Sequence, residues 1–167
     1  MSNQSDLPSE PNAPERMLAE GELLQLVTFH IADEEFGVDI LSVQEIIRLM
    51  QITPVPRAPA CIEGVINLRG KVIPVIDMRK RFNLPAIERD SRTRIIVMEF
   101  DTKIVGFLVD AVSEVLRIPA NTVEPSPAIV SGVGSEYILG VGKLDDRLLI
   151  LLDLDSMLDG MDMGTAV

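Results

Sequence analysis

The 167-residue sequence contains only one cysteine and one histidine, and it has no tryptophan. The single thiol, Cys61, excludes a disulfide framework and any metal site built from several cysteines. The single imidazole, His30, excludes a histidine-rich zinc or iron centre. A free thiol is typical of a protein in a reducing compartment.

Long hydrophobic runs are absent as well. No uninterrupted apolar segment approaches the ~18–20 residues that a membrane-spanning helix needs, and the N-terminus lacks the apolar core of a signal peptide. We therefore expect a cytoplasmic protein without direct membrane insertion. Residues 1–21 are polar, acidic and interrupted by prolines, which predicts a flexible tail, and residues 159–167 predict a second one.

Aromatic residues make up only 4% of the chain, although hydrophobic residues reach 47%. The core must therefore be aliphatic. The sequence contains 17 valines and 17 isoleucines, and these β-branched side chains favour pleated sheets over helices. The composition thus predicts a mostly β protein with short helical turns.

Charge is both unbalanced and unevenly placed. The formal net charge is −11, which argues against general nucleic-acid binding because duplex affinity rests on Lys and Arg. Residues 48–94 nevertheless hold ten cations against four acids, a net +6, whereas the remainder holds five cations against 22 acids, a net −17. This asymmetry fits an electrostatically matched partner or a solvated surface on which like charges cluster, and both interpretations stay open.

The chain repeats itself once. A shift of 69 residues places Leu26–Leu49 on Ile95–Ile118 without a gap, and a shift of 76 places Val65–Met78 on Val141–Leu154. Two copies cannot make a solenoid. They predict two related lobes, from copies at about 26–78 and 95–154. Each lobe is too small to bury enough surface alone, so we expect a shared apolar interface.

Short apolar runs separated by polar turns predict β-hairpins in each copy. The runs lie at residues 23–31, 71–77, 94–100 and 147–153. Residues 43–48 predict a strand after a helical turn at 40–42, and the three prolines within 49–61 predict an extended loop.

Glycines at matched strand positions, Gly37 and Gly106, predict bulges or bends.

Catalytic chemistry is hard to find. The segment from Gly64 to Val72 resembles a phosphate-binding loop, but its glycines are one residue too far apart and Val72 replaces the required Ser or Thr. His30 has no nucleophile or acid beside it in the sequence, and Cys61 is expected to be a buried small hydrophobe. Aspartates such as Asp153 fit turn and cap roles. We expect no enzyme, no cofactor and no metal site.

One turn stands out, formed by Asn67-Leu68-Arg69-Gly70 between two apolar strands. Asn and Gly tolerate the left-handed backbone of tight turns. A cation held there needs a carboxylate partner, and Glu45 is a candidate in the same copy. The second copy has Asp145 where the first has Arg69, so we expect the two turns to differ in charge. Arg69 either pins a loop or is presented to a partner.

The run from Pro59 to Gly70 follows the pattern P-x-x-I-x-G-V-x-N-L-R-G, and it resembles the CheW-like domain family of bacterial chemotaxis. The resemblance covers residues 22–158. It implies two SH3-like five-stranded β-barrel lobes that share an apolar interface, with strand exchange between the lobes permitted. Since the sequence shows no kinase, phosphotransfer or receiver segment, the expectation is a stand-alone adaptor.

The resemblance also implies the partners. Such adaptors couple the cytoplasmic hairpin tip of chemoreceptors to the regulatory domain of the histidine kinase CheA, at membrane-associated receptor arrays. They have no catalysis, and the chain alone is expected to be a monomer. Carried over onto this sequence, the receptor groove comprises Val43, Glu45, Ile46, Gly64, Asn67, Leu68 and Arg69, with Ile95, Val105 and Gly106 as its other wall. The kinase face comprises Asp39, Ile40 and Leu41.

Two other functions compete with the adaptor. A barrel could bind single-stranded nucleic acid through residues 48–94, although such sites need stacking aromatics and Phe82 is the only one there. Alternatively, the apolar space between lobes could bind a small molecule, which would raise the melting temperature.

Overall fold

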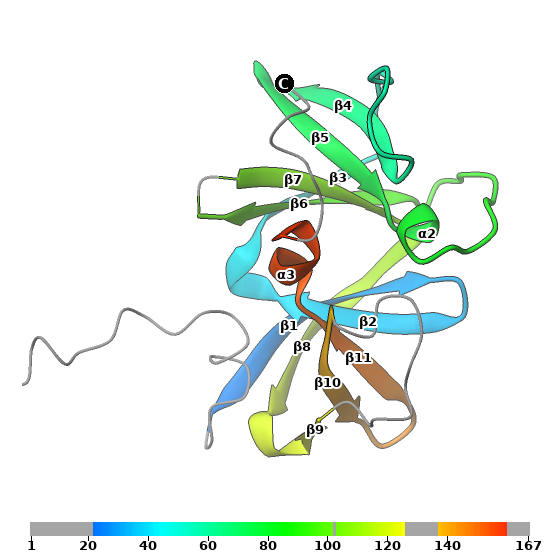
Figure 1. The fold of residues 1–167 in the computed structure, drawn as a ribbon. Coiled ribbons are helices and arrows are strands. Elements are labelled where there is room, and N and C mark those ends of the chain that lie inside the picture. The colour runs from blue at the N-terminus through cyan, green and yellow to red at the C-terminus, as the bar shows by residue number, and fades with distance from the viewer. Residues whose placement is uncertain (1–21, 102, 126–136, 160–167) are drawn as a thin grey trace, which may run out of the picture.

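The computed structural model describes residues 22–101, 103–125 and 137–159, so both predicted tails lie largely outside the described residues. Strands dominate it, and all described helices are short (Figure 1). The elements are β1 (Leu23–Ile31), β2 (Glu34–Asp39), η2 (Ile40–Ser42), β3 (Val43–Arg48), β4 (Ile62–Leu68), β5 (Lys71–Asp77), α2 (Met78–Arg81), β6 (Arg94–Phe100), β7 (Lys103–Val109), β8 (Ala111–Pro119), η3 (Ala120–Thr122), β9 (Val123–Glu124), β10 (Ile138–Lys143), β11 (Leu148–Leu152) and α3 (Leu154–Asp159).

The strands form two sheets, which we name the five-stranded lobe and the six-stranded lobe. The five-stranded lobe has the order β3-β6-β7-β5-β4, and the six-stranded lobe has the order β8-β1-β2-β11-β10-β9. The predicted mostly β, two-lobed fold is therefore confirmed, with the short strand β9 added to one lobe. The predicted strand at Val43–Arg48 and the helical turn before it are also confirmed.

Each lobe is assembled from both sequence copies. The five-stranded lobe takes β3, β4 and β5 from the first copy and the hairpin β6–β7 from the second. The six-stranded lobe takes β8, β10 and β11 from the second copy and the hairpin β1–β2 from the first. The exchange is symmetric, since Val75 pairs with Gly106 in one parallel ladder and Leu151 pairs with Gly37 in the other. The copies are equivalent in structure, but neither copy is a lobe.

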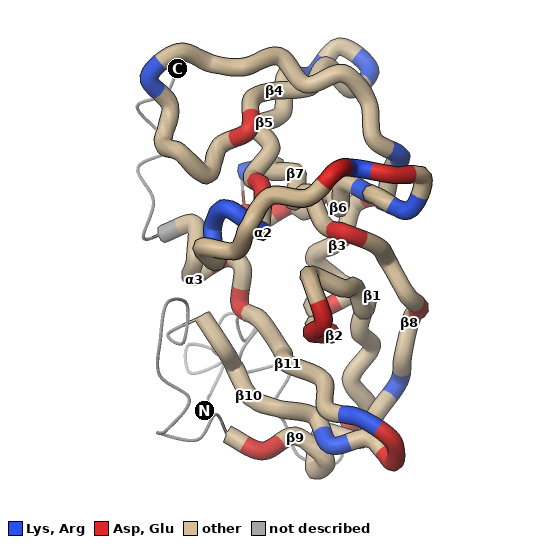
Figure 2. The backbone as a smooth tube through the Cα atoms, turned by 90° about the vertical axis from the view of Figure 1, so that its right-hand side faces the viewer, with Lys and Arg blue, Asp and Glu red and all other residues tan. Residues whose placement is uncertain are grey.

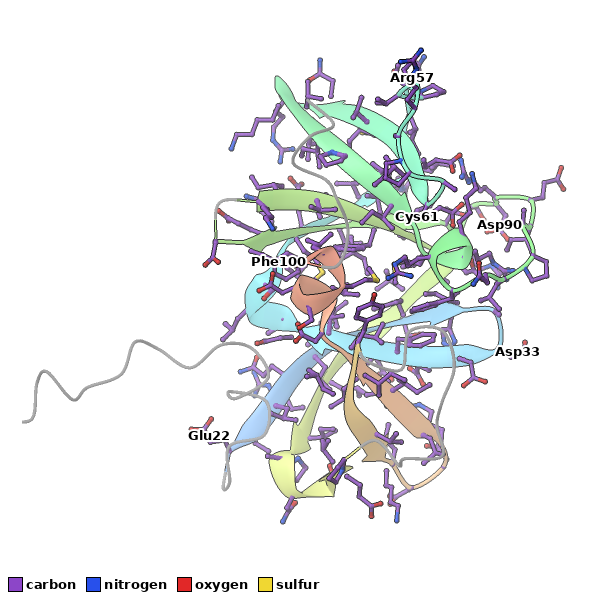
Figure 3. The ribbon with its side chains drawn as sticks, viewed as in Figure 1. Glu22, Asp33, Arg57, Cys61, Asp90 and Phe100 are labelled. Atoms are coloured by element: carbon purple, nitrogen blue, oxygen red, sulfur yellow. The ribbon has the colours of Figure 1, made fainter. Side chains whose placement is uncertain are left out.

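The largest hydrophobic core lies between the lobes, as the sequence predicts. Eighteen buried described residues belong to it, including Phe29 and Val38 of the six-stranded lobe and Phe107 of the five-stranded lobe. Helix α3 lies between the two sheets and adds Met157, which is fully buried (Figure 1). Figure 3 shows Phe100 directed toward this interface beside α3. Two smaller cores of six residues each fill the barrels themselves.

Polar contacts at the ends of the hairpins repeat in the two copies. The Asp77 amide donates to the Cys61 carbonyl at 2.8 Å, and the Asp153 amide donates to the Tyr137 carbonyl at the same distance. Both aspartates then cap the following helix, which confirms the cap role that the sequence predicts for Asp153. The guanidinium of Arg81 lies 4.8 Å from the centre of the Tyr137 ring, so α2 is also fixed onto the opposite lobe.

The predicted bulges at Gly37 and Gly106 are wrong. Both glycines pair in regular register, and the shifts lie elsewhere, for example between Val43 and Glu45. An added Cβ at Gly106 would lie 2.8 Å from Cγ2 of Ile95. Glycine is therefore needed at these positions for close packing inside the barrels rather than for a change of register.

Candidate functional site

The turn between β4 and β5 presents Arg69 to solvent. The side chain of Asn67 accepts a hydrogen bond from the Gly70 amide at 2.9 Å, which closes the turn. Arg69 and Gly70 both have left-handed backbone, with φ of 53° and 88°. Seventy-one per cent of the Arg69 side chain is exposed. The turn therefore holds a cation at the end of the five-stranded lobe.

Arg69 forms an ion pair with Glu45 of β3, so the predicted partner is confirmed. The pair joins the edge strand β3 to the β4–β5 turn and so helps to close the barrel. Since the guanidinium is largely solvated, an ion pair of this kind contributes only about 0–1 kcal/mol to stability. Removal of the Arg69 side chain should therefore lower the free energy of unfolding only slightly, and its guanidinium is accessible to a partner.

The other predicted receptor-groove residues fall into two groups. Ile46 and Asn67 are exposed, whereas Val43 and Leu68 are half-buried, Val43 against the core between the lobes and Leu68 against the core of the five-stranded barrel. Gly64 is buried beneath the loop that precedes β4.

Gly64 has a φ of 153°, and an added Cβ there would collide with the Thr53 backbone. The Thr53 and Val65 backbones exchange two hydrogen bonds of 2.8 Å, which hold that loop down.

The second wall, assigned to Ile95, Val105 and Gly106, lies beneath the surface. Ile95 is fully buried inside the five-stranded barrel, and Val105, which is 2% exposed, belongs to the core between the lobes. Their side chains point to opposite faces of the sheet. In this conformation their side chains are packed into the two cores, and their strands, β6 and β7, pair with β3 and β5 in the same sheet.

The three residues assigned to the kinase face lie at the crossover from β2 to β3. Asp39 caps η2 by accepting a hydrogen bond from the Leu41 amide at 2.9 Å, and Ile40 packs against the core between the lobes. Leu41 is 74% exposed. Together with Leu23, which is 61% exposed, it borders a shallow hollow of about 90 Å³.

The six-stranded lobe repeats the arginine–glutamate contact, which the sequence reasoning missed. Arg147, directly before β11, donates to Glu114 of β8 at 2.8 Å and to Glu35 of β2 at 2.6 Å. The hydrogen bond to Glu35 holds the pKa of the Arg147 guanidinium above its usual value. The alignment of Arg69 with Asp145 obscured this pair. The signal was present two residues later, where Lys71 aligns with Arg147.

A second ion-pair cluster ties the lobes together at the other crossover. Asp110, between β7 and β8, accepts from Arg79 Nε at 3.0 Å and from the Ala32 amide at 2.8 Å. Burial raises the pKa of the Asp110 carboxyl, but the hydrogen bonds from Arg79 and Ala32 outweigh burial and lower it overall. Asp110 therefore joins α2 to the β1–β2 turn.

The adjoining hollow, of about 280 Å³, is lined largely by these and neighbouring ion pairs. Lys80 and Arg89 both contact Glu63, and Arg89 also contacts Asp77. The cations and carboxylates that line this hollow therefore neutralise one another.

The two residues considered for chemistry lie outside these clusters. His30 is half-buried in β1, and Cys61 packs against the core between the lobes (Figure 3). Burial raises the pKa of the Cys61 thiol against the opposing effect of Arg81, so the reactive thiolate is disfavoured. Among the residues that the structure describes, no group of His, Cys, Asp and Glu could hold a metal ion, and no helix is long and apolar enough to cross a membrane.

Comparison with known proteins gives one consistent result. The CheW-like domain family matches residues 25–161. The chain is 39% identical to the chemotaxis protein CheW of Klebsiella aerogenes over 84% of each chain. It is 40% identical to the chemotaxis protein CheW of Rhizobium meliloti, over 80% of this chain and 86% of that one. The crystal structure of the scaffolding protein TtCheW from Thermoanaerobacter tengcongensis superposes with a TM-score of 0.72 at 40% identity, covering 77% of this chain and 88% of that one.

Proposed function

The chain belongs to the CheW-like domain family, and on that premise we propose that it couples the cytoplasmic tip of chemoreceptors to the regulatory domain of the histidine kinase CheA. As a CheW-like protein it is a chemotaxis scaffold and not an enzyme. The finer assignment of partners, of binding residues and of a place at membrane-associated receptor arrays is our proposal. The observation that carries it is the largely exposed Arg69, which a closed turn holds at the end of the five-stranded lobe.

The receptor tip is proposed to dock on the surface around Arg69. The same lobe exposes two apolar side chains, Ile46 of β3, which is 38% exposed, and Val72 of β5, which is 69% exposed. A helix from the receptor hairpin could place apolar side chains against these residues and a polar group against Arg69, which is helix-in-groove recognition. Ile95 and Val105 would act only by supporting the strands beneath.

The kinase domain is proposed to dock at the β2–β3 crossover. Leu41 is the best anchor there because it is largely exposed and borders the hollow with Leu23. Asp39 and Ile40 would act indirectly, by capping and packing η2 so that Leu41 is held in place. This surface is distinct from the Arg69 turn, so one chain could bind both partners at once.

The two competing functions find little support. Phe82, the aromatic residue that a nucleic-acid site over residues 48–94 would need, stacks on Phe36 at 5.6 Å and packs against the core between the lobes. It is not free to stack on bases. In the part of the chain that the structure describes, the space between the lobes holds packed core side chains and α3, and neither described hollow lies there.

An NMR titration tests the proposal. Amide shifts of the full chain are followed with a receptor hairpin fragment, and separately with a CheA regulatory domain. We expect the receptor fragment to shift residues around Arg69 and the kinase domain to shift residues around Leu41. The same face shifting with both partners, or no shift with either, would contradict the bridging role.

Variants sharpen the test. Arg69→Ala should weaken receptor binding while the melting temperature falls by at most about 2–4 °C, because its ion pair is exposed and contributes no more than about 1 kcal/mol. Leu41→Asp should weaken kinase binding alone. Lys143→Ala provides a matched control, since Lys143 is an exposed cation in an ion pair on the other lobe.

A further inference from the structure

The two hollows described above lie at equivalent places in the repeat. We name the smaller one, at the β2–β3 crossover, the apolar hollow, and the larger one, at the β7–β8 crossover, the charged hollow. The 69-residue shift that aligns the copies places Asp39 and Leu41 of the apolar hollow on Leu108 and Asp110 of the charged hollow. The segments that border the two hollows can therefore be compared residue by residue.

The charged hollow is partly covered by the loop that leads from α2 into β6. Ile87 and Arg89 of this loop line the hollow. Arg79 of α2 holds the loop in place, since it donates to the Pro85 carbonyl at 2.7 Å and to Asp110 at 2.8 Å. Figure 2 shows charged residues along both α2 and this loop. In the second copy, the segment that precedes the first strand thus folds over the crossover.

The apolar hollow exposes leucines where the charged hollow has an ion pair. Leu41, which is 74% exposed, stands where the second copy has Asp110, and Leu23, which is 61% exposed, borders the same hollow. The 76-residue shift places Asp155 of α3 where α2 has Arg79, so the cation that holds the loop has no sequence equivalent here. A segment that covers the apolar hollow must therefore contact it through apolar side chains.

The segment that leads into β1 carries such side chains. The 69-residue shift places Met17 and Leu18 on Ala86 and Ile87, and both of these loop residues line the charged hollow. Leu18 stands four positions before Glu22, which is the first described residue and itself lines the apolar hollow. Four residues span at most about 14 Å. Both apolar side chains are therefore within reach of the hollow.

We propose that Met17 and Leu18 dock on the apolar hollow, against Leu23 and Leu41. The segment before β1 would then cover the β2–β3 crossover as the loop before β6 covers the β7–β8 crossover. Gly21 permits the sharp turn that this path needs. Burial of apolar surface takes the place of the ion pairs that hold the equivalent loop.

Docking of this segment would regulate the proposed kinase surface. Leu41 is the proposed anchor for the kinase domain, so the segment and the kinase domain would compete for it. The apparent affinity for the kinase domain falls in proportion to the fraction of chains whose hollow is open. This consequence rests on the proposed function, whereas the docking itself does not.

NMR of the full chain tests the docking. A double variant carries Met17→Ser and Leu18→Ser, and Leu7→Ser is the matched control, since it removes an apolar side chain of the same segment further from the hollow along the chain. We expect the Leu41 signals to shift in the double variant and to stay in place in the control. Leu41 is far from both substitutions in sequence, so the shift reports contact in space. Unchanged Leu41 signals in the double variant, or equal shifts in the control, would overturn the docking.

Calorimetry with the CheA regulatory domain tests the regulation. We expect the double variant to bind about 3–10-fold more tightly than wild type and Leu7→Ser, as for a hollow that is covered in about two thirds to nine tenths of the chains. A Leu41 shift with unchanged kinase affinity would retain the docking and overturn the competition. If the kinase domain binds none of the three chains, the proposed function fails, while the Leu41 signals still decide the docking.

Discussion

Arg69 and Arg147 close equivalent barrels in different ways. Arg69 contacts a single described carboxylate, Glu45, and keeps 71% of its side chain in solvent. Arg147 contacts Glu35, Glu114 and Asp146 and is 35% exposed, and Glu35 itself is only 8% exposed. The same contact thus serves mainly as a brace in the six-stranded lobe and leaves a cation available for binding in the five-stranded lobe. Duplication of a fold allows one copy of a contact to stabilise the fold while the other is free to bind.

The two crossovers between lobes differ in a similar way. The β7–β8 crossover is tied by Asp110 to Arg79 and to the Ala32 amide. The β2–β3 crossover, at the equivalent place in the first copy, carries η2 and exposes Leu41. One crossover is closed by ion pairs, and the other presents an apolar side chain. In both comparisons the proposed binding residue lies in the copy that makes fewer internal contacts.

Alanine substitutions at the equivalent positions Gly37 and Gly106 should give the largest difference in stability between the two barrels. Gly106→Ala should destabilise the chain by about 1–3 kcal/mol, because the added Cβ would lie 2.8 Å from Ile95 in a filled barrel. Gly37→Ala should cost less, since its Cβ would meet the flexible ends of Leu149 and Leu151 at 3.3 Å. Urea unfolding of both variants measures the difference. Equal costs would mean that the two barrels are packed alike.

Removing the Asp110 carboxylate, which ties the β7–β8 crossover to Arg79 and to the Ala32 amide, should have the next largest effect on stability. Asp110→Ala should destabilise the chain by about 2 kcal/mol, because it leaves Arg79, which is 14% exposed, without its carboxylate partner. Glu124→Ala is the control, since it breaks the exposed Glu124–Lys143 pair and should leave the unfolding midpoint nearly unchanged. If the two variants unfold alike, Asp110 does not hold the lobes together.

Substitution of Arg147 should reduce stability more than substitution of Arg69. Arg147→Ala should lower the melting temperature by several degrees, because nearly buried Glu35 loses its hydrogen-bond donor. Arg69→Ala should lower it by much less. Scanning calorimetry of the two variants under the same conditions gives the comparison. A larger loss of stability for Arg69→Ala would contradict the stabilising role that we assign to Arg147.

Acid should break the hydrogen bonds of Asp110 with Arg79 and Ala32 before it unfolds the chain. Hydrogen bonds lower the pKa of Asp110, and those from Lys80 and Arg89 likewise outweigh burial at Glu63. A carboxyl with a lowered folded-state pKa stabilises the fold fully above its unfolded value, near pH 4, and loses that contribution as pH falls through the folded value. We expect the Ala32 amide signal to shift below about pH 4, and Asp110→Asn to abolish that shift.

Local chemistry made much of this architecture predictable. Alternating apolar runs predicted the hairpins, and the short Asn67–Gly70 turn predicted where a cation would need Glu45. The interface between lobes followed from copies too small to bury their own cores. Each of these inferences depends on residues close together in one copy.

Contacts between the copies were harder to predict. Nothing in the sequence of the β1–β2 hairpin says that it pairs with β8 and β11 of the second copy, because strand pairing depends on partners far along the chain. The same difficulty hid the Glu35–Arg147 bond, which joins residues 112 positions apart. It also hid the burial of Ile95 and Val105, whose exposure depends on the sheets packed around them. The binding roles of the surface residues stay predictions.

The exchanged hairpins have a consequence for the ancestry and the divisibility of this chain. A half-length chain carrying either copy alone could not close a barrel, since each barrel needs a hairpin from the other copy. Two half-length chains could close barrels only by exchanging hairpins with each other. The protein therefore has the connectivity of a swapped homodimer joined into one polypeptide. A cut between the halves would yield two fragments that complement each other and not two independent modules.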